Sequence, residues 1–188
     1  MITEKIGSYS LFVQGLRDAN VTDSEKVLRD LRGSFPEVDL QLLRADRVAG
    51  REHIVFSARN AVDSFQSKDR RAKHLSMEFL LFASGEHQIT EAIKLLGVTA
   101  SSRTLALVGL SETSLDSNRL SNRAMESVKG IPDDTVLQIS TPKKAEDLKR
   151  AYNIPDKELN ASKMRGEEDD SVLMRLIIER SALLALQN

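Results

Sequence analysis

Two periods of hydrophobic residues alternate along the chain, a period of two that predicts strands and a period near 3.6 that predicts helices. Residues 8–16 form a short strand-like run. A capping box at residues 22–25 then opens a helix that Gly33 can close. Residues 38–48 partly alternate apolar and polar side chains, which is typical of a half-buried strand, and residues 53–56 can extend it.

The middle of the chain carries three consecutive helical stripes. The first spans residues 58–65 and has apolar side chains at the i, i+3, i+4 and i+7 positions. The second spans residues 67–83 and has so broad an apolar face that we expect it to be buried on more than one side. A turn at residues 84–85 interrupts the pattern, which resumes at residues 86–96 and ends at Gly97.

The second half of the chain continues the alternation of strands and helices. It is predicted to contain a strand at 103–110, a helix at 118–129, a strand at 135–140, a helix from Pro142 to Tyr152 capped by Thr141, a helical turn at 154–155 and a final helix from Asp169. This order indicates an α/β (or α+β) fold with one mixed sheet of about four or five strands flanked by helices. No linker divides the sequence, so we expect residues 1–188 to form a single domain.

The composition fits a globular protein that folds by burying a core. Hydrophobic residues make up 40% of the 188 residues and charged residues 29%. The absence of Cys excludes disulfides and thiolate metal sites. The first residues lack the features of a secretory leader, and no apolar run reaches the roughly 18 residues of a membrane helix, so we expect a cytoplasmic protein.

Candidate catalytic and metal-binding residues are few. The three His, at positions 53, 74 and 87, do not form a metal-binding motif, and the common nucleotide-binding and hydrolase motifs are missing. We therefore expect no catalytic residue, no metal, no cofactor and no small-molecule substrate, and we expect the protein not to be an enzyme. An enzyme with an unrecognised pocket is the alternative.

One segment departs from the near-neutral charge of the chain, which is −1 overall. Residues 67–74 hold four cationic side chains and one carboxylate, a net charge of +3. The helical spacing of Arg71, His74 and Glu78 predicts a polar edge on the second helix. The segment is either the solvated start of that helix or a patch that contacts phosphates. Its candidate RNA-binding residues are Lys68, Arg70, Arg71, Lys73 and His74.

The turn that ends the same helix is a second candidate RNA contact. Ser84 and Gly85 would form a tight turn, with His87 and Gln88 exposed at the start of the next helix. Beside this structural role, backbone N–H groups and the side chains of His87 and Gln88 could hold phosphates or a base edge near the basic segment. The candidate residues of the turn are Ser84, Gly85, His87 and Gln88.

Apolar residues surround more of the last helix than one core-facing stripe requires. The helix therefore either packs within the protein or presents part of its apolar surface to a groove on a partner. The candidate partner-binding residues are Ile177, Leu184 and Leu186.

Residues 75–97 resemble the helix-SG-helix core of the PRPK-binding protein family, which supplies a subunit of the KEOPS tRNA-modifying complex. The resemblance rests on Glu78, Leu80, Leu81, Ser84, Gly85, Gln88, Ile89, Ala92, Ile93 and Gly97. A less specific similarity extends to residues 178–184 in the last helix. At position 87 the chain has His where we expect Arg in many relatives, and a neutral imidazole makes the weaker phosphate contact.

The resemblance implies a non-catalytic subunit of the complex that makes threonylcarbamoyladenosine (t6A) beside the tRNA anticodon. Another subunit of that complex performs the transfer, and this family's member binds a small kinase-like ATPase. Archaeal members are also implicated in holding the 3′ CCA end of tRNA. The expected partners are thus the kinase-like ATPase and tRNA, with no membrane. The alternative is an interaction module that regulates the ATPase without touching RNA.

Overall fold

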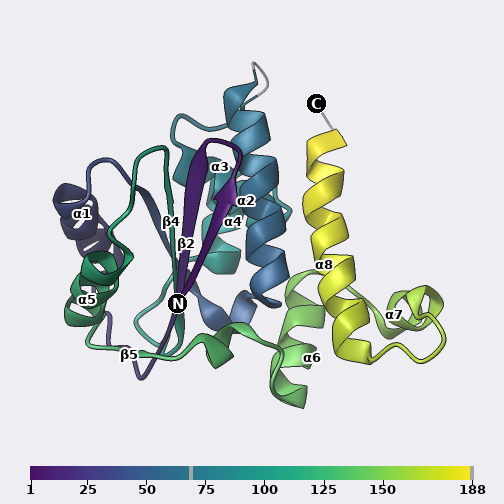
Figure 1. Ribbon diagram of the computed structural model, residues 1–188. Coiled ribbons are helices and arrows are strands. Elements are labelled where there is room, and N and C mark those ends of the chain that lie inside the picture. The colour runs from purple at the N-terminus through teal and green to yellow at the C-terminus, as the bar shows by residue number, and fades with distance from the viewer. Residues whose placement is uncertain (68–69, 187–188) are drawn as a thin grey trace.

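A computed structural model describes residues 1–67 and 70–186 as a sheet with helices on both faces (Figure 1). The five-stranded sheet has the order β1-β2-β4-β3, with β5 paired to β2. Its strands are β1 (Ile2–Ile6), β2 (Tyr9–Arg17), β3 (Asp39–Arg44), β4 (Leu105–Ser111) and β5 (Ile131–Pro132). The described pairings are all antiparallel. The fold class and strand number are confirmed, whereas the expected mixed sheet is wrong.

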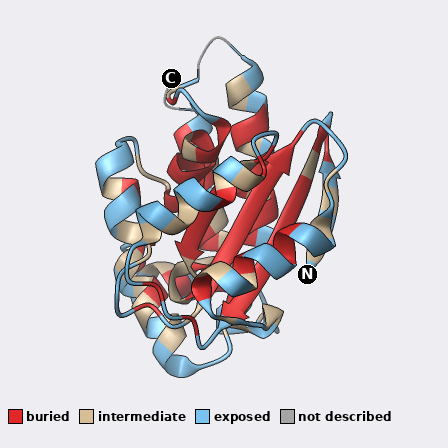
Figure 2. Cartoon of the chain, turned by 90° about the vertical axis from the view of Figure 1, so that its left-hand side faces the viewer, coloured by how far each residue is buried: buried red, intermediate tan, exposed pale blue. Residues whose placement is uncertain are grey.

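The helices of the described residues fall into three groups. Helices α1 (Ser24–Ser34) and α5 (Ser117–Val128) cover one face of the sheet, with their exposed sides turned outward in Figure 2. Helices α2 (Arg51–Gln66), α3 (Leu75–Ser84) and α4 (Ile89–Leu96) lie on the other face. Helices α6 (Pro142–Ala151), α7 (Asp156–Ser162) and α8 (Asp169–Leu186) pack beyond them. None of these helices is both long and apolar enough to cross a membrane.

Alternating side chains of the strands form separate cores on the two faces of the sheet. Along β2, Leu11 and Val13 belong to the core beneath α2 and α3, while Phe12 and Leu16 belong to the core beneath α1 and α5. A third apolar cluster lies between α6, α7 and α8. Every residue of α3 except Met77 is buried, which confirms that this helix is covered on more than one side.

Capping side chains explain where several helices begin. Thr141 accepts the backbone N–H of Lys144 at 3.2 Å and Pro142 occupies the first turn of α6, as predicted. In α1 the N-cap is Asp23, whose carboxylate accepts the N–H of Lys26 at 2.8 Å. The predicted capping box at residues 22–25 is therefore wrong by one position.

Two further predictions of local structure are wrong, and a strand was missed. Residues 53–56 lie in α2, because their apolar side chains extend the helical stripe that continues to residue 65. Within residues 135–140 there is no strand: a 3-10 helix, Asp134–Leu137, follows Asp133, whose carboxylate accepts the N–H of Thr135. Strand β1 was not predicted at all.

A side chain from α1 covers part of the outer edge of the sheet at β3, and farther along this strand Leu43 pairs with Gly97 in an isolated bridge. Arg32 Nη2 donates to the backbone oxygen of Leu40 at 2.8 Å, and its Nε lies 3.3 Å from the same oxygen. Because β3 is the terminal strand of the order β1-β2-β4-β3, this carbonyl has no strand on its outer side to pair with.

Candidate RNA- and partner-binding surface

The described part of the basic segment, residues 70–74, is an irregular connection between α2 and α3. Helix α3 begins at Leu75 with His74 as its N-cap, so the helix predicted from residue 67 is wrong. Arg71 precedes the helix and Glu78 is buried inside it, so these residues do not form the predicted polar edge. Residues 70–74 therefore form a loop, which backbone hydrogen bonds to a side chain of α3 hold in place.

Glu78 holds this loop in place. Its side chain has no exposed surface, and one carboxyl oxygen accepts the backbone N–H groups of Arg71 at 3.0 Å and Ala72 at 2.7 Å. The other oxygen accepts the hydroxyl of Ser64, near the end of α2, at 2.7 Å. Because this one carboxyl group accepts two backbone N–H groups of the loop and the hydroxyl of Ser64, it joins the loop, α2 and α3 at one buried point.

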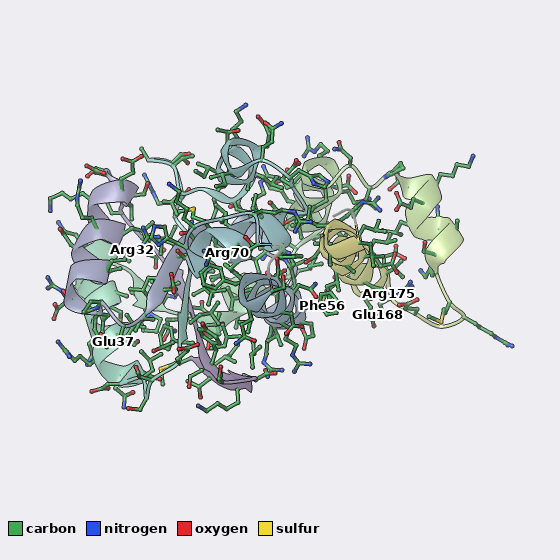
Figure 3. All side chains as sticks on the ribbon, turned by 90° about the horizontal axis from the view of Figure 1, so that it is seen from above. Arg32, Glu37, Phe56, Arg70, Glu168 and Arg175 are labelled. Atoms are coloured by element: carbon green, nitrogen blue, oxygen red, sulfur yellow. The ribbon has the colours of Figure 1, made fainter. Side chains whose placement is uncertain are left out.

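The side chains of the loop are not equally available to a ligand. Arg70, Lys73 and His74 are exposed, and the Arg70 guanidinium lies over the ring of Phe65, 5.3 Å from its centroid. Figure 3 shows Arg70 over the middle of the molecule, well apart from Arg175. Lys68, the remaining predicted residue of the segment, lies outside the described residues.

Arg71 points the other way, toward α8. Its Nη2 donates to the backbone oxygen of Leu184 at 2.7 Å, and its guanidinium lies over the ring of Phe82 at 5.7 Å. The Nη1 atom is inaccessible to solvent. Arg71 thus contacts the protein interior, whereas its neighbour Arg70 faces solvent.

The turn that follows α3 is built as a helix cap. Gly85 has a φ of +68° and its N–H group closes the end of α3. Ser84 is buried, and its Oγ donates to Leu81 O at 2.9 Å and accepts the N–H of Glu86 at 3.2 Å. A Cβ atom at Gly85 would approach the Cβ of Arg180 in α8 to 3.1 Å. Ser84 and Gly85 are thus occupied by the turn itself.

His87 and Gln88 are the exposed residues of this turn, as predicted. Gln88 is the N-cap of α4, so both residues come just before the first turn of that helix. Their side chains, unlike that of the buried Ser84, can be reached by a ligand.

Two buried polar side chains brace the same turn from inside. His53 Nε2 lies 2.8 Å from the backbone oxygen of Ala83, and His53 Nδ1 accepts the N–H of Ala49 at 3.2 Å. The imidazole is therefore neutral with its proton on Nε2, and burial lowers its pKa from 6.5 to about 4. Tyr152 donates to the same Ala83 oxygen at 3.1 Å, and burial raises the pKa of its hydroxyl.

The sequence did not assign a role to either of these residues. His53 directly precedes the apolar residues Ile54 to Phe56, which is the one sequence signal that its ring is buried. The partner atoms of both side chains are backbone groups brought in from distant segments, and no local pattern predicts such contacts.

The apolar residues of α8 divide into buried and exposed sets. Ile177 and Leu184 are each 1% exposed and pack within the chain, so neither reaches the surface in this structure. Leu186 is 80% exposed and Leu183 is 46% exposed. Of the three predicted partner-binding residues, Leu186 is thus the one whose side chain is accessible to a partner.

The two predicted RNA contacts lie at opposite ends of α3. This helix has ten residues, or roughly 15 Å at 1.5 Å per residue, so the turn does not bring residues 84–88 beside residues 70–74. Helix α8 touches both, near Leu184 at one end of α3 and near Arg180 at the other. The end of α2 and the C-terminal end of α8 lie at the same end of the molecule (Figures 1 and 2).

The chemistry of this surface is that of binding. Exposed cations on a fixed loop can contact phosphates, and exposed Leu side chains can enter an apolar groove. Within residues 1–67 and 70–186, no group of three or more His, Asp or Glu side chains is arranged to hold a metal ion.

Comparisons with known proteins give one consistent result. The model of a family described as kinase binding protein CGI-121 matches residues 19–184. A regulatory protein, Cgi121 of Methanocaldococcus jannaschii, is 34% identical over 133 residues, which cover 71% of this chain and 78% of the relative. The residues matched by the family model include the loop at residues 70–74, α3, the turn that follows it and most of α8.

Proposed function

The chain belongs to the kinase binding protein CGI-121 family, and from this premise we propose that it is the non-catalytic, kinase-binding subunit of a KEOPS complex. In this role it binds the kinase-like ATPase, recruits tRNA through the 3′ CCA end and supports t6A formation in the cytoplasm. Residues 1–188 act as a single domain. The family match over residues 19–184 is the observation that carries the proposal.

The C-terminal end of α8 is the surface proposed for the kinase. Leu183 and Leu186 are exposed there, whereas the other large apolar side chains of the helix are buried or partly buried. Large exposed apolar side chains near a helix end are suited to a groove on another protein. Ile177 and Leu184 contribute indirectly, by packing α8 onto the chain.

The loop at residues 70–74 and the turn at residues 87–88 are the surfaces proposed for tRNA. Arg70 and Lys73 supply exposed positive charge in a chain whose net charge is −1, so the contact must be local. A local patch of this kind contacts phosphates without reading sequence.

A gel-shift measurement at fixed salt tests the tRNA part. Cognate tRNA with an intact 3′ CCA end should bind more tightly than the same tRNA from which CCA has been removed. Equal affinity for both would contradict recruitment through this end.

A second candidate function is an interaction module that regulates the ATPase without RNA. The nearly neutral charge of the chain favours it, because RNA-binding domains are commonly basic. Co-purification from native extract separates the two: ATPase with tRNA supports the first function, and ATPase that stays bound with no tRNA after ribonuclease-free isolation supports the second.

A further inference from the structure

Arg70 and Arg71 are adjacent in the sequence, but their guanidinium groups differ in solvent exposure and in hydrogen bonding within the protein. Arg70 is exposed and rests on the face of Phe65. Arg71 is half-buried, its Nη1 is inaccessible to solvent and its Nη2 donates to Leu184 O at 2.7 Å. A phosphate could reach the first guanidinium freely, whereas it would have to displace protein contacts to reach the second.

The acceptor of Arg71 is a backbone oxygen near the C-terminal end of α8. The described part of this helix runs from Asp169 to Leu186, so Leu184 lies in its last described turn. A cation at this position also complements the negative end of the helix dipole. Arg71 therefore caps α8 from a different part of the chain.

Arg71 is held at its backbone as well as at its side chain. The buried carboxyl group of Glu78 accepts its N–H at 3.0 Å, and the Phe82 ring lies 5.7 Å below its guanidinium. The loop is thus fixed to α3 through Glu78 and to α8 through Arg71. Between these two fixed points the chain has little freedom to change the direction of its exposed side chains.

We propose that Arg71 is a positioning residue for RNA binding: it holds the loop against the end of α8 so that Arg70 and Lys73 face solvent in fixed directions. Arg71 itself does not contact phosphate. The inference rests on the proposed tRNA-binding function, and it assigns the phosphate contacts to Arg70 and Lys73. It also makes the loop and the C-terminal turn of α8 one composite surface.

Salt dependence separates a positioning residue from a phosphate contact. The affinity for cognate tRNA is measured by gel shift over a series of salt concentrations for the full-length wild type, Arg71→Gln, Arg71→Lys and the matched control Arg70→Gln. The plot of log affinity against log salt has a negative slope, and losing one phosphate contact makes this slope shallower by about 0.7 to 0.9. We expect this change for Arg70→Gln.

For Arg71→Gln we expect a loss of affinity of about 3- to 10-fold at every salt concentration with the wild-type slope. Arg71→Lys keeps the charge but lacks the planar fork that stacks on Phe82, so it should remain at least about 2-fold weaker than the wild type. The proposal would be overturned if the slope of Arg71→Gln were as shallow as that of Arg70→Gln. Wild-type affinity in Arg71→Lys would also overturn it.

An RNA-free measurement keeps the inference distinct from the proposed function. Amide hydrogen exchange at residues 70–74 should be about 10-fold faster in both Arg71 variants than in the wild type and unchanged in Arg70→Gln. Wild-type exchange in Arg71→Gln would refute positioning. Absence of tRNA binding by the wild type would instead refute the proposed function. Thermal unfolding shows whether each variant folds. If Arg71→Gln does not fold, the test uses Arg71→Lys alone, because this variant keeps the positive charge beside the end of α8.

Discussion

The buried carboxyl group of Glu78 accepts hydrogen bonds from three donors, all of which are buried or partly buried. Two of them, the N–H groups of Arg71 and Ala72, belong to the loop, and the third is the Ser64 hydroxyl. The sequence placed Glu78 on an exposed edge because its spacing from His74 fits a helix surface. Burial by other elements decided otherwise, and that burial depends on contacts between distant residues.

Glu78→Ala should lower the free energy of unfolding by about 3 kcal/mol, because each buried donor left unsatisfied costs about 1 to 3 kcal/mol. Glu78→Gln should lower it by less, since the amide oxygen can accept the two N–H groups while the hydroxyl of Ser64 can accept from the amide nitrogen. Urea unfolding of the wild type and both variants measures the difference. Equal losses in the two variants would show that the acceptor geometry is not what matters.

His53 makes the stability of the protein depend on pH. Burial lowers its pKa in the folded state to about 4, whereas the unfolded value is near 6.5. Between these values the unfolded chain binds the proton more readily than the folded chain. The contribution is therefore complete above about pH 6.5 and is lost as the pH falls toward 4.

We expect His53 to account for about 2 kcal/mol of the stability lost between about pH 7.5 and pH 5. His53→Gln can keep a donor and an acceptor but does not titrate, so its stability should fall less over this interval. Urea unfolding at both pH values checks this. Parallel losses in wild type and variant would rule out His53 as the titrating group.

Helix α3 separates the two loops that face solvent, and its ends set their shapes. Long apolar stripes were sufficient to predict the helices around it. In residues 58–65 and in the segment from Asp169, the spacing of the apolar residues fits a helix that buries them. Short elements were missed or misjudged. Strand β1 has exposed polar residues between its apolar ends, and β5 has two residues, so neither has a pattern long enough to be distinguished from a loop.

Gly85→Ala should destabilise the protein by about 1 to 2 kcal/mol, because its φ of +68° disfavours a side chain and the new Cβ would press on Arg180 of α8 at 3.1 Å. Gly166→Ala is a matched control, since Gly166 has a φ of +81° with no atom within 4 Å of the added Cβ. The extra loss at Gly85 in thermal or urea unfolding measures the contact between the turn and α8. No difference between the two variants would contradict a close contact there.

The proposed kinase surface and the loop at residues 70–74 lie near one end of the molecule, where α2 and α8 both finish (Figure 1), whereas the turn at residues 87–88 follows the other end of α3. The sequence indicated each surface separately but not their adjacency, because the loop at residues 70–74 and Leu184 are far apart in the chain. Strand direction was equally out of reach. Antiparallel and parallel pairing bury the same apolar side chains, and only the path of the connections distinguishes them.

Leu186→Asp should weaken binding of the kinase-like ATPase by about 10-fold or more without lowering the stability of the chain, since the side chain is 80% exposed. Met164→Asp is the control, because Met164 is 64% exposed and precedes α8, far along the helix from Leu186. Binding by isothermal calorimetry compares the two. Equal weakening, or none in Leu186→Asp, would exclude the C-terminal end of α8 from the interface.

The contact of Arg32 with the edge strand β3 disfavours aggregation through that strand at high protein concentration. An uncovered terminal strand is a template onto which a second molecule can add a strand, and such addition leads to aggregation. With its guanidinium bound to Leu40 O, Arg32 blocks that template with a charged group. Addition of a strand from a second copy is therefore disfavoured at this position of β3, while the exposed apolar side chains at the end of α8 remain available to the proposed partner.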